Sequence, residues 1–193
     1  ALKELQIVEI NPGYLEIIKD YEEHSRITEN PKVMIHTDDG RRWLRRQSDD
    51  VKFDFMLMNT TFHWRSHASN LLSVEFLNLC KIHLKSGGVV FYNTTGSDDV
   101  VRTAAEVFKY VTMVGNFVAA SDSPFNINSE QRRANLLRFK DDNGSPTFLR
   151  TAAFRSELER LVKMELPELG EKMRSSKKFD VITDDNMASE FTG

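Results

Sequence analysis

The sequence lacks most of the features that would quickly assign it to a functional class. Cys80 is the single cysteine among 193 residues, so an internal disulfide and a cysteine-based zinc site are both excluded. No apolar run approaches the roughly 18 residues that cross a bilayer. A net charge of -3 gives no general attraction to nucleic acid or to anionic lipid. The composition, 40% hydrophobic and 28% charged, suits one soluble domain with a substantial core.

Three short apolar runs in the first third of the chain each end in polar residues. They cover about residues 5–10, 32–37 and 53–59, and a segment with helical spacing follows each of them. This alternation predicts a parallel sheet, whose ligands gather at the carboxyl ends of the strands. Ser86-Gly87-Gly88 is typical of a helix end followed by a turn. The pattern also predicts strands at 89–92 and 110–120, and helices at 71–84, 98–109, 129–138 and 147–164.

Acids at two strand ends are the first candidates for a binding site. Glu9 ends the first run, where a carboxylate suits both hydroxyls of a ribose. Asp38 or Asp39 ends the second run, where an acid or its neighbours would meet an adenine amino group. Asp38 and Asp39 also suit the N-cap of the next helix. Taken alone, either acid is explained about equally well as a helix cap and as a ligand-binding residue. Together, in consecutive strand-helix units, the acids favour nucleoside binding.

The next two strands end in the same tripeptide, Asn59-Thr60-Thr61 and Asn93-Thr94-Thr95. Because neighbouring parallel strands end at one edge of a sheet, both tripeptides would line one polar rim. The rim is either a hydrogen-bonding pocket for a polar ligand or ordinary turn chemistry, in which Asn and Thr satisfy loose backbone groups. The residues alone leave this choice open.

A loop with imidazole, aromatic and basic side chains follows the third strand. His63 and His67 would share a metal ion only in a helix, and no acid lies nearby to complete a ligand set, so we expect no metal site. Trp64 and Arg65 are candidates to stack on and pair with a substrate, although packing explains Trp64 as well.

The segment 40–47 predicts a short amphipathic helix after the second strand. Its Trp43 and Leu44 are expected to face inward. Its basic residues are expected to form one solvated face rather than a nucleic-acid site. They are Arg41, Arg42, Arg45 and Arg46.

Several motifs follow one another along the chain at a recognisable spacing. They are Val8-Glu9-Ile10-Asn11-Pro12, Asp39-Gly40-Arg41-Arg42-Trp43-Leu44, Phe53-Asp54 at the start of an apolar strand, and Glu75-Phe76 before Leu84-Lys85-Ser86-Gly87-Gly88-Val89. In this order they resemble the spermidine synthase (polyamine aminopropyltransferase) family. The tail from Ile182 to Glu190 resembles the ending of that family's membrane-fused bacterial members. The resemblance is good over about 7–92, poor over 120–175, and returns in the tail.

This resemblance implies both a fold and a class of ligand. The fold is α/β, a doubly wound, mostly parallel sheet of the S-adenosylmethionine-dependent methyltransferase type. The ligand is S-adenosylmethionine, its decarboxylated form as a substrate, or the methylthioadenosine product, with a polyamine as acceptor. Glu9 then matches the ribose-binding acid, and Asp39 the residue beside the adenine. The further cofactor-binding candidates are Asp38 and Asn59, and the substrate-binding candidates are Thr60, Trp64, Arg65, Asn93 and Glu190.

One departure from the family concerns the sheet. The family's glycine-rich loop follows a strand that precedes the strand of Glu9, and this chain has neither. In the family's fold that strand lies at the centre of the sheet, between the strands that end here at Ile10 and Asn59. We therefore expect a sheet that lacks its first, central strand and glycine-rich loop, and a natural protein that continues upstream of Ala1.

The other departure concerns the reaction. The family activates the amine with an acidic pair after the third strand, and Asn59 and Phe62 stand at those positions. An amide cannot take a proton near neutral pH, and phenylalanine has no proton acceptor at all. Standard aminopropyl transfer is therefore not expected. The replacement bases that we consider are His63, His67, Asp184, Asp185 and Glu190.

The sequence thus predicts a single spermidine synthase-like domain over 1–193, a fragment of a longer protein, with a Rossmann-like core at 1–120 and an extension at 121–193. Its leading function is that of a nucleoside-binding transferase domain. The first rival is an ordinary methyltransferase that uses S-adenosylmethionine and needs no acidic pair. The second is a non-catalytic module for ligand sensing or for contacts with a membrane-embedded partner. We expect a cytoplasmic location, with the soluble domain of a membrane protein as the alternative, and a homodimer as a further candidate assembly.

Overall fold

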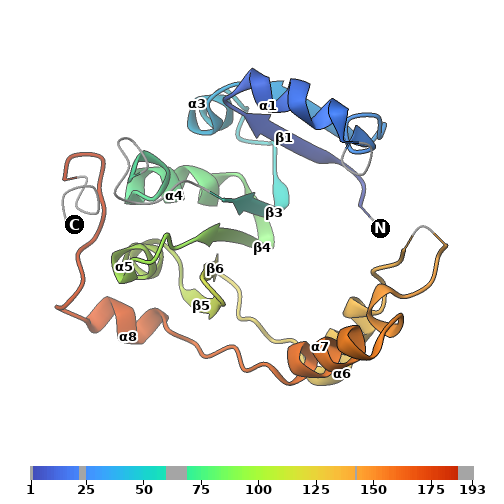
Figure 1. Ribbon diagram of the computed structural model, residues 1–193. Coiled ribbons are helices and arrows are strands. Elements are labelled where there is room, and N and C mark those ends of the chain that lie inside the picture. The colour runs from blue at the N-terminus through green and yellow to red at the C-terminus, as the bar shows by residue number, and fades with distance from the viewer. Residues whose placement is uncertain (1, 22–24, 60–68, 142, 187–193) are drawn as a thin grey trace.

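The computed structural model describes residues 2–21, 25–59, 69–141 and 143–186. The strands within these residues form two sheets, one of β1 and β2 and one in the order β3-β4-β6-β5 (Figure 1). The pairs β1-β2 and β3-β4 are parallel, whereas β6 runs antiparallel to both of its neighbours. The strands are β1 (Leu5–Glu9), β2 (Val33–Thr37), β3 (Phe53–Met58), β4 (Leu84–Asn93), β5 (Tyr110–Val114) and β6 (Phe117–Ser121). The fold is a mixed α/β fold, as the sequence predicts, with its sheet in two parts.

Helices connect the parallel strands, and side-chain caps begin several of them. Asp39 accepts a hydrogen bond from the Arg42 N–H at the start of α3, and Ser73 accepts one from the Phe76 N–H at the start of α4. Among the described residues no helix has the length and apolar character needed to cross a membrane. The helices are α1 (Pro12–Ile17), η1 (Ile18–Asp20), α3 (Gly40–Arg45), η2 (Ser69–Leu71), α4 (Val74–Ile82), α5 (Asp98–Val107), α6 (Ser129–Leu136), η3 (Thr147–Leu149), α7 (Ala152–Lys163) and α8 (Gly170–Ser175).

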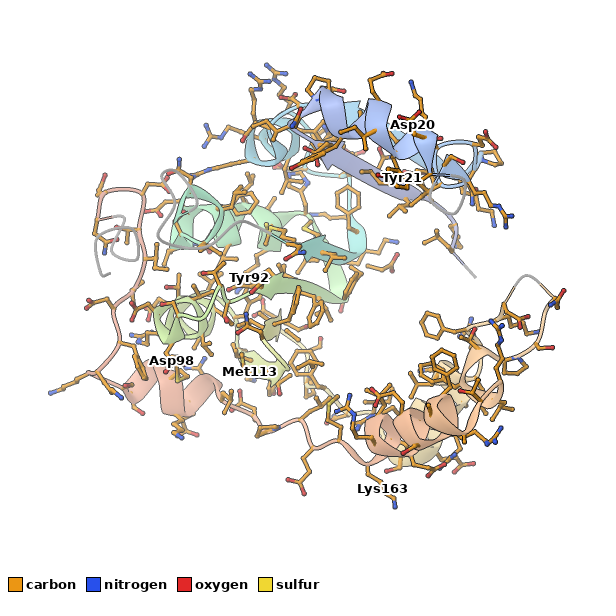
Figure 2. All side chains as sticks on the ribbon, viewed as in Figure 1. Asp20, Tyr21, Tyr92, Asp98, Met113 and Lys163 are labelled. Atoms are coloured by element: carbon orange, nitrogen blue, oxygen red, sulfur yellow. The ribbon has the colours of Figure 1, made fainter. Side chains whose placement is uncertain are left out.

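The core lies between one face of the four-stranded sheet and helices α4 and α5. Tyr92 of β4 is completely buried and lies in the middle of the molecule (Figure 2). Alternate residues of a strand share a face, so Val90 and Tyr92 point toward the helices together. From the helical side the core is filled by Phe76, Leu77, Cys80, Val100, Val101 and Ala104. The core therefore belongs to the part of the fold that contains β3 to β6.

Two strand predictions are wrong in detail. β4 begins at Leu84, so Ser86-Gly87-Gly88 lies within the strand instead of in a turn after a helix. A Cβ atom at Gly88 would meet the backbone oxygens of Lys85 and Phe53 at 2.9 and 3.1 Å, which explains why glycine is needed where β3 and β4 converge. The single strand predicted at 110–120 is a hairpin of β5 and β6, with a two-residue turn that starts at Gly115 (φ 60°).

Helices α6 and α7 form a helical hairpin that stands apart from the core in Figure 1. The Arg132 guanidinium donates hydrogen bonds to the backbone oxygens of Leu161 (3.2 Å), Val162 (3.3 Å) and Met164 at the C-terminal end of α7. Extended segments connect the hairpin to β6 and to α8. The sequence analysis predicts no helix at the position of α8, whose short apolar pattern consists mainly of the buried Met173.

Candidate functional site

A cleft of about 1400 Å³ lies between the two sheets. Consecutive residues of two strands line it, 5–10 along β1 and 55–59 along β3. Because successive side chains of a strand point to opposite faces, consecutive lining residues mean that the strand edges border the cleft. Within the described part of the chain, β1 pairs only with β2, and β3 is hydrogen-bonded only to β4. The cleft therefore lies where the sequence analysis expects a central strand to be missing.

Glu9 and Asp39 meet at this cleft from the ends of two paired strands. β1 and β2 run in parallel with Glu9 opposite Thr37, and both acids line the cleft. The Glu9 carboxylate accepts a hydrogen bond from the Asn11 N–H at 2.7 Å through Oε1. Asp39 accepts from the Arg42 N–H at 2.8 Å through Oδ1 and so caps α3. The second oxygen of each carboxylate accepts no hydrogen bond from the described residues, so Asp39 is able to cap a helix and hold a ligand at once.

Asp38 lies outside the lining of the cleft. Its carboxylate accepts hydrogen bonds from Arg42 Nε at 2.5 Å and from Arg46 Nη1 at 3.2 Å. Burial raises the pKa of Asp38, but the Arg42 hydrogen bond and the guanidinium charges outweigh burial and lower the pKa on balance. Position at a strand end does not choose between these two adjacent acids; the structure places Asp39, the one that the resemblance favours, at the cleft and pairs Asp38 with arginines.

The part of the predicted polar rim that the structure describes, Asn59 and residues 93–95, is present, and Thr60 and Thr61 lie outside the described residues. Asn93 Nδ2 donates a hydrogen bond to Asn59 Oδ1 at 3.1 Å. Asn93 Oδ1 accepts from Asn116 Nδ2 and from the Thr95 N–H, both at 2.8 Å, and Thr94 Oγ1 donates to Asn116 Oδ1 at 2.9 Å. The described rim residues are therefore satisfied by hydrogen bonds among themselves and to Asn116, as turn chemistry requires. Asn59 is the rim residue that borders the cleft.

Asp184 reaches the cleft from the far end of the sequence. Its Oδ1 accepts from Arg41 Nη1 at 2.8 Å and from Ser73 Oγ at 2.7 Å, and its Oδ2 accepts from Arg41 Nη2 at 2.5 Å. The Arg41 hydrogen bonds hold the pKa of Asp184 below its usual value. A carboxylate with both oxygens occupied and a lowered pKa is poorly suited to take a proton from an amine. Asp185 is exposed and lies outside the lining of the cleft.

Arg41 is a residue that the sequence analysis assigned wrongly. Its side chain is only 14% exposed, so it does not belong to the solvated arginine face that includes Arg42, Arg45 and Arg46. Ser73 was not considered at all. The sequence did contain a signal for the role of Arg41, because Arg41 lies in the same motif as Asp39. An acid in the tail needs a basic partner from another part of the chain, and this motif offers one.

The remaining candidates have no described position. Thr60, Phe62, His63, Trp64, Arg65, His67 and Glu190 lie outside the described residues, so their roles stay predictions. Within the described residues no three potential metal ligands of the His, Cys, Asp and Glu types come together.

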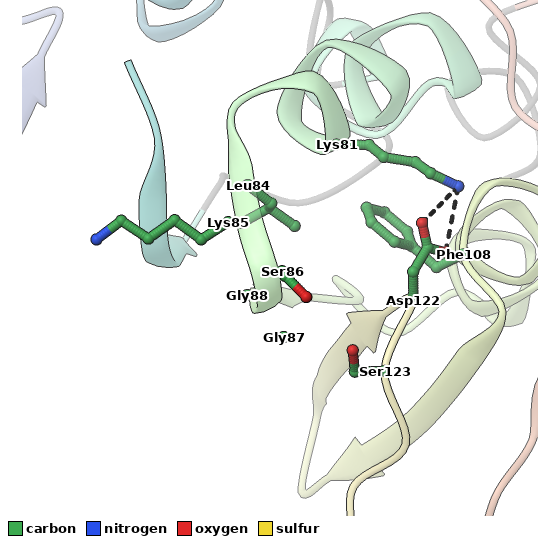
Figure 3. A pocket seen from close by; sticks show the side chains of 9 residues that line it. All are labelled: Lys81, Leu84, Lys85, Ser86, Gly87, Gly88, Phe108, Asp122 and Ser123. Atoms are coloured by element: carbon green, nitrogen blue, oxygen red, sulfur yellow. Dashed lines mark hydrogen bonds and ion pairs between the residues drawn. The ribbon is translucent and has the colours of Figure 1, made fainter. Parts of the chain in front are cut away.

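A smaller cavity of about 310 Å³ lies at the start of β4, at the opposite end of the strand from Asn93 (Figure 3). Lys81 Nζ contacts Asp122 at 2.9 Å and donates to the backbone oxygen of Val107 at 2.8 Å. Lys85 Nζ contacts Asp54 at 2.7 Å. Since both cations are neutralised by acids, this cavity offers no excess charge to an anionic ligand. The large cleft is the better candidate site.

Comparison with known proteins gives a family match and two informative structures. The family model described as the spermine/spermidine synthase domain matches residues 1–124. No curated protein sequence matches. A probable spermidine synthase from Corynebacterium glutamicum is similar in structure, with 20% identity and a TM-score of 0.50 over 73% of this chain and 55% of that chain. Spermidine synthase from Thermotoga maritima has 18% identity and a TM-score of 0.53 over 82% of this chain and 60% of that chain.

These structures are too distant in sequence to show more than the fold. A third, human methyltransferase-like protein 13 in complex with SAH, has 14% identity and a TM-score of 0.48, over 86% of this chain and 84% of that chain, and carries no argument here. The chain spans 55% and 60% of the lengths of the two spermidine synthase chains.

Proposed function

This chain belongs to the spermine/spermidine synthase domain family, and we propose that it forms the nucleoside-binding part of a transferase. One observation carries the proposal: Glu9 and Asp39 line the same cleft from the ends of two paired parallel strands. A carboxylate at the position of Glu9 suits the two hydroxyls of a ribose, and one at Asp39 suits an adenine amino group. The ligand class is S-adenosylmethionine, its decarboxylated form as substrate, or methylthioadenosine.

One end of the cleft suits a nucleoside, but the whole cleft is larger than a small-molecule site needs to be. Its volume of about 1400 Å³ exceeds the roughly 300–1,000 Å³ of most small-molecule sites. Gly40 is the one glycine among the residues that line it, so these residues include no glycine-rich loop for the methionine end of the ligand. Near the cleft, Tyr14, Phe55 and Leu57 are 61%, 54% and 62% exposed. The surplus space is therefore bordered by apolar side chains and by strand edges.

We further propose that a strand and loop from outside these 193 residues fill the space between β1 and β3. Each of these strands has an edge whose backbone groups pair with no other described strand, and an inserted parallel strand would satisfy both edges. The test is hydrogen exchange on β1 and β3 in this chain and in the full-length protein. Slower exchange along both strands in the full-length protein supports the insertion. Equal exchange in the two forms contradicts it.

Nucleoside binding is tested by calorimetry on the full-length protein with methylthioadenosine and S-adenosylmethionine. Glu9→Gln and Asp39→Asn should each weaken binding about 10- to 100-fold, because each removes a charged hydrogen-bond acceptor from the site. Asp54→Asn is the matched control, since the Asp54 side chain is 83% exposed beside Lys85 and lies outside the lining of the cleft, and it should leave the affinity unchanged. Absence of binding, or equal binding by wild type and Glu9→Gln, would overturn the proposal.

The reaction has two candidates that differ in their need for a base. Aminopropyl transfer requires a group that accepts the amine proton, and His63, His67 and Glu190 are the remaining candidates for it. Methyl transfer needs no acidic pair, so the amide at Asn59 favours it. The Asn59 side-chain oxygen accepts a hydrogen bond from Asn93 and provides no acid. Product analysis separates the two, because aminopropyl transfer from decarboxylated S-adenosylmethionine releases methylthioadenosine and methyl transfer from S-adenosylmethionine releases S-adenosylhomocysteine. Binding with neither product indicates the non-catalytic module.

A further inference from the structure

The C-terminal strap, residues 180–186, is anchored in the core before it reaches the cleft. Ile182 is completely buried. Its N–H donates to Thr103 Oγ1 of α5 at 2.9 Å, and its backbone oxygen accepts from the Val74 N–H of α4 at 2.9 Å. Two helices of the core therefore determine where the strap runs and where Asp184, two residues further on, is placed.

Arg41 joins the strap to two other segments that border the cleft. Besides its two hydrogen bonds to Asp184, it donates from Nη1 to the backbone oxygen of Asn70 at 2.9 Å. Its guanidinium lies over the ring of Phe76, with Cζ 5.9 Å from the ring centroid. The Asp184 N–H in turn donates to Glu75 Oε2 at 3.0 Å. A bidentate guanidinium-carboxylate pair fixes orientation as well as distance, so the strap, α3 and the start of α4 are held in one geometry.

This pair lies next to the turn that carries Asp39. Asp39 is the N-cap of α3 and Arg41 is the second residue of that helix. The Asp39 backbone oxygen accepts from the Trp43 N–H at 2.8 Å, which ties the turn to the helix a second time. Asp39, Arg41 and Asp184 all line the cleft. A displacement of Arg41 therefore displaces the carboxylate that the proposed function assigns to the adenine.

We propose that Asp184 and Arg41 are a positioning pair, through which the C-terminal strap holds Asp39 in place to bind the nucleoside. The proposal rests on the proposed function and assigns Asp184 a role different from that of a catalytic base. Both carboxylate oxygens of Asp184 are already bonded to Arg41 and Ser73, so the acid acts through Arg41 and not on a reacting atom.

A double-mutant cycle on the full-length protein tests this pairing. Methylthioadenosine affinity is measured by calorimetry for Arg41→Lys, Asp184→Asn and the double variant, at a temperature where circular dichroism shows all of them folded. Lysine keeps the charge of Arg41 but loses the fork geometry. Each single change should weaken binding about 3- to 30-fold. The double variant should bind methylthioadenosine no more weakly than the single variant with the lower affinity, because the two side chains share one interaction.

The matched control is Glu159→Gln in the helical hairpin. It breaks another bidentate pair, in which Arg133 donates to both oxygens of Glu159 at 2.7 Å, but it lies outside the cleft. A general loss of ion pairing would affect both variants, whereas positioning of Asp39 predicts that only Asp184→Asn changes the affinity. Wild-type affinity in Asp184→Asn, or losses that add in the double variant, would overturn the positioning pair.

Hydrogen exchange without ligand distinguishes this proposal from the proposed function. Asp184→Asn should speed exchange at the amides of Arg42 and Trp43. The Arg42 N–H donates a hydrogen bond to the Asp39 side chain, and the Trp43 N–H donates one to the Asp39 backbone oxygen. Unchanged exchange at these two amides overturns the positioning pair alone, while wild-type nucleoside binding stands. Wild-type protein that binds no methylthioadenosine overturns the proposed function, and with it the ligand that the pair is said to serve.

Discussion

Asn93 Nδ2 donates a hydrogen bond to Asn59 Oδ1 across 3.1 Å, and this bond joins the ends of two parallel strands at the border of the cleft. The amide of Asn59 stands where the resemblance to the family calls for an acid. Because an amide oxygen accepts hydrogen bonds but takes no proton near neutral pH, this pair stabilises the rim without supplying a base. The relationship makes Asn59 the position at which the reaction is most directly tested.

Asn59→Asp should raise aminopropyl transfer. Aspartate keeps an oxygen for Asn93 and adds a carboxylate at the cleft, and a positioned base contributes about 10²- to 10⁴-fold, so a gain of at least about tenfold is expected. The measurement is methylthioadenosine released from decarboxylated S-adenosylmethionine and a polyamine by the full-length protein. Asn59→Ala is the control and should show no gain. An inactive Asn59→Asp variant that still binds methylthioadenosine would show that the acid is not what the site lacks.

The contribution of Asp184 to holding the strap should be constant down to about pH 4 and should decline at lower pH. In the folded protein, the hydrogen bonds from Arg41 hold the pKa of Asp184 below its ordinary value of 3.8. A carboxylate with a lowered folded pKa contributes stability that is present above the unfolded value and is lost as the pH falls through the folded value. Hydrogen exchange at the Ile182 amide, corrected for intrinsic rates, should therefore be constant from pH 7 to about pH 4 and accelerate at lower pH. If Asp184→Asn shows the same acid step as wild type, another group causes it.

Cys80 should be unreactive in the native protein. Its side chain is 1% exposed, and burial raises the pKa of the thiol to about 12. At pH 8 only about one thiol in 10⁴ is then ionised, and it has no access to reagent. Labelling with a thiol reagent should follow the rate of unfolding and should be complete at one thiol per chain in guanidinium chloride. Rapid labelling under native conditions would mean that Cys80 of α4 is not packed in the core as described.

Gly88→Ala should destabilise the sheet where β3 and β4 converge. The added methyl group would lie 2.9 Å from the Lys85 oxygen and 3.1 Å from the Phe53 oxygen, both of which belong to backbone that cannot rotate away. Overpacking of this kind costs about 1–3 kcal/mol. The Tm measured by circular dichroism should fall by about 2–12 °C, since 1 kcal/mol shifts the Tm of a chain of this size by about 2–4 °C. Gly40→Ala, whose Cβ meets nothing within 4 Å, is the control and should leave the Tm unchanged or slightly higher. Equal Tm values for the two variants would contradict the close approach of the strands.

Local patterns account for the features that the sequence predicted. β1, β2 and β3 each lie within a predicted apolar run, and Glu9 and Asp39 follow from their positions at strand ends. The β5-β6 hairpin was predictable as well, since Gly115-Asn116 between two apolar runs is a turn signal. Such features depend on interactions between residues that are close in sequence, so the local pattern of residues is enough to predict them.

The sequence by itself determined the α/β class, the resemblance to the family and the two acids at strand ends. The strand-end pattern leaves Asp38 and Asp39 equivalent and the resemblance favours Asp39; the tertiary structure shows that Asp39 lines the cleft and Asp38 does not, because adjacent side chains diverge according to the backbone of one turn. Only the tertiary structure paired Arg41 with Asp184, which lie 143 residues apart. No local pattern encodes a contact over that separation, since it exists only after the core has placed both segments beside the same cleft.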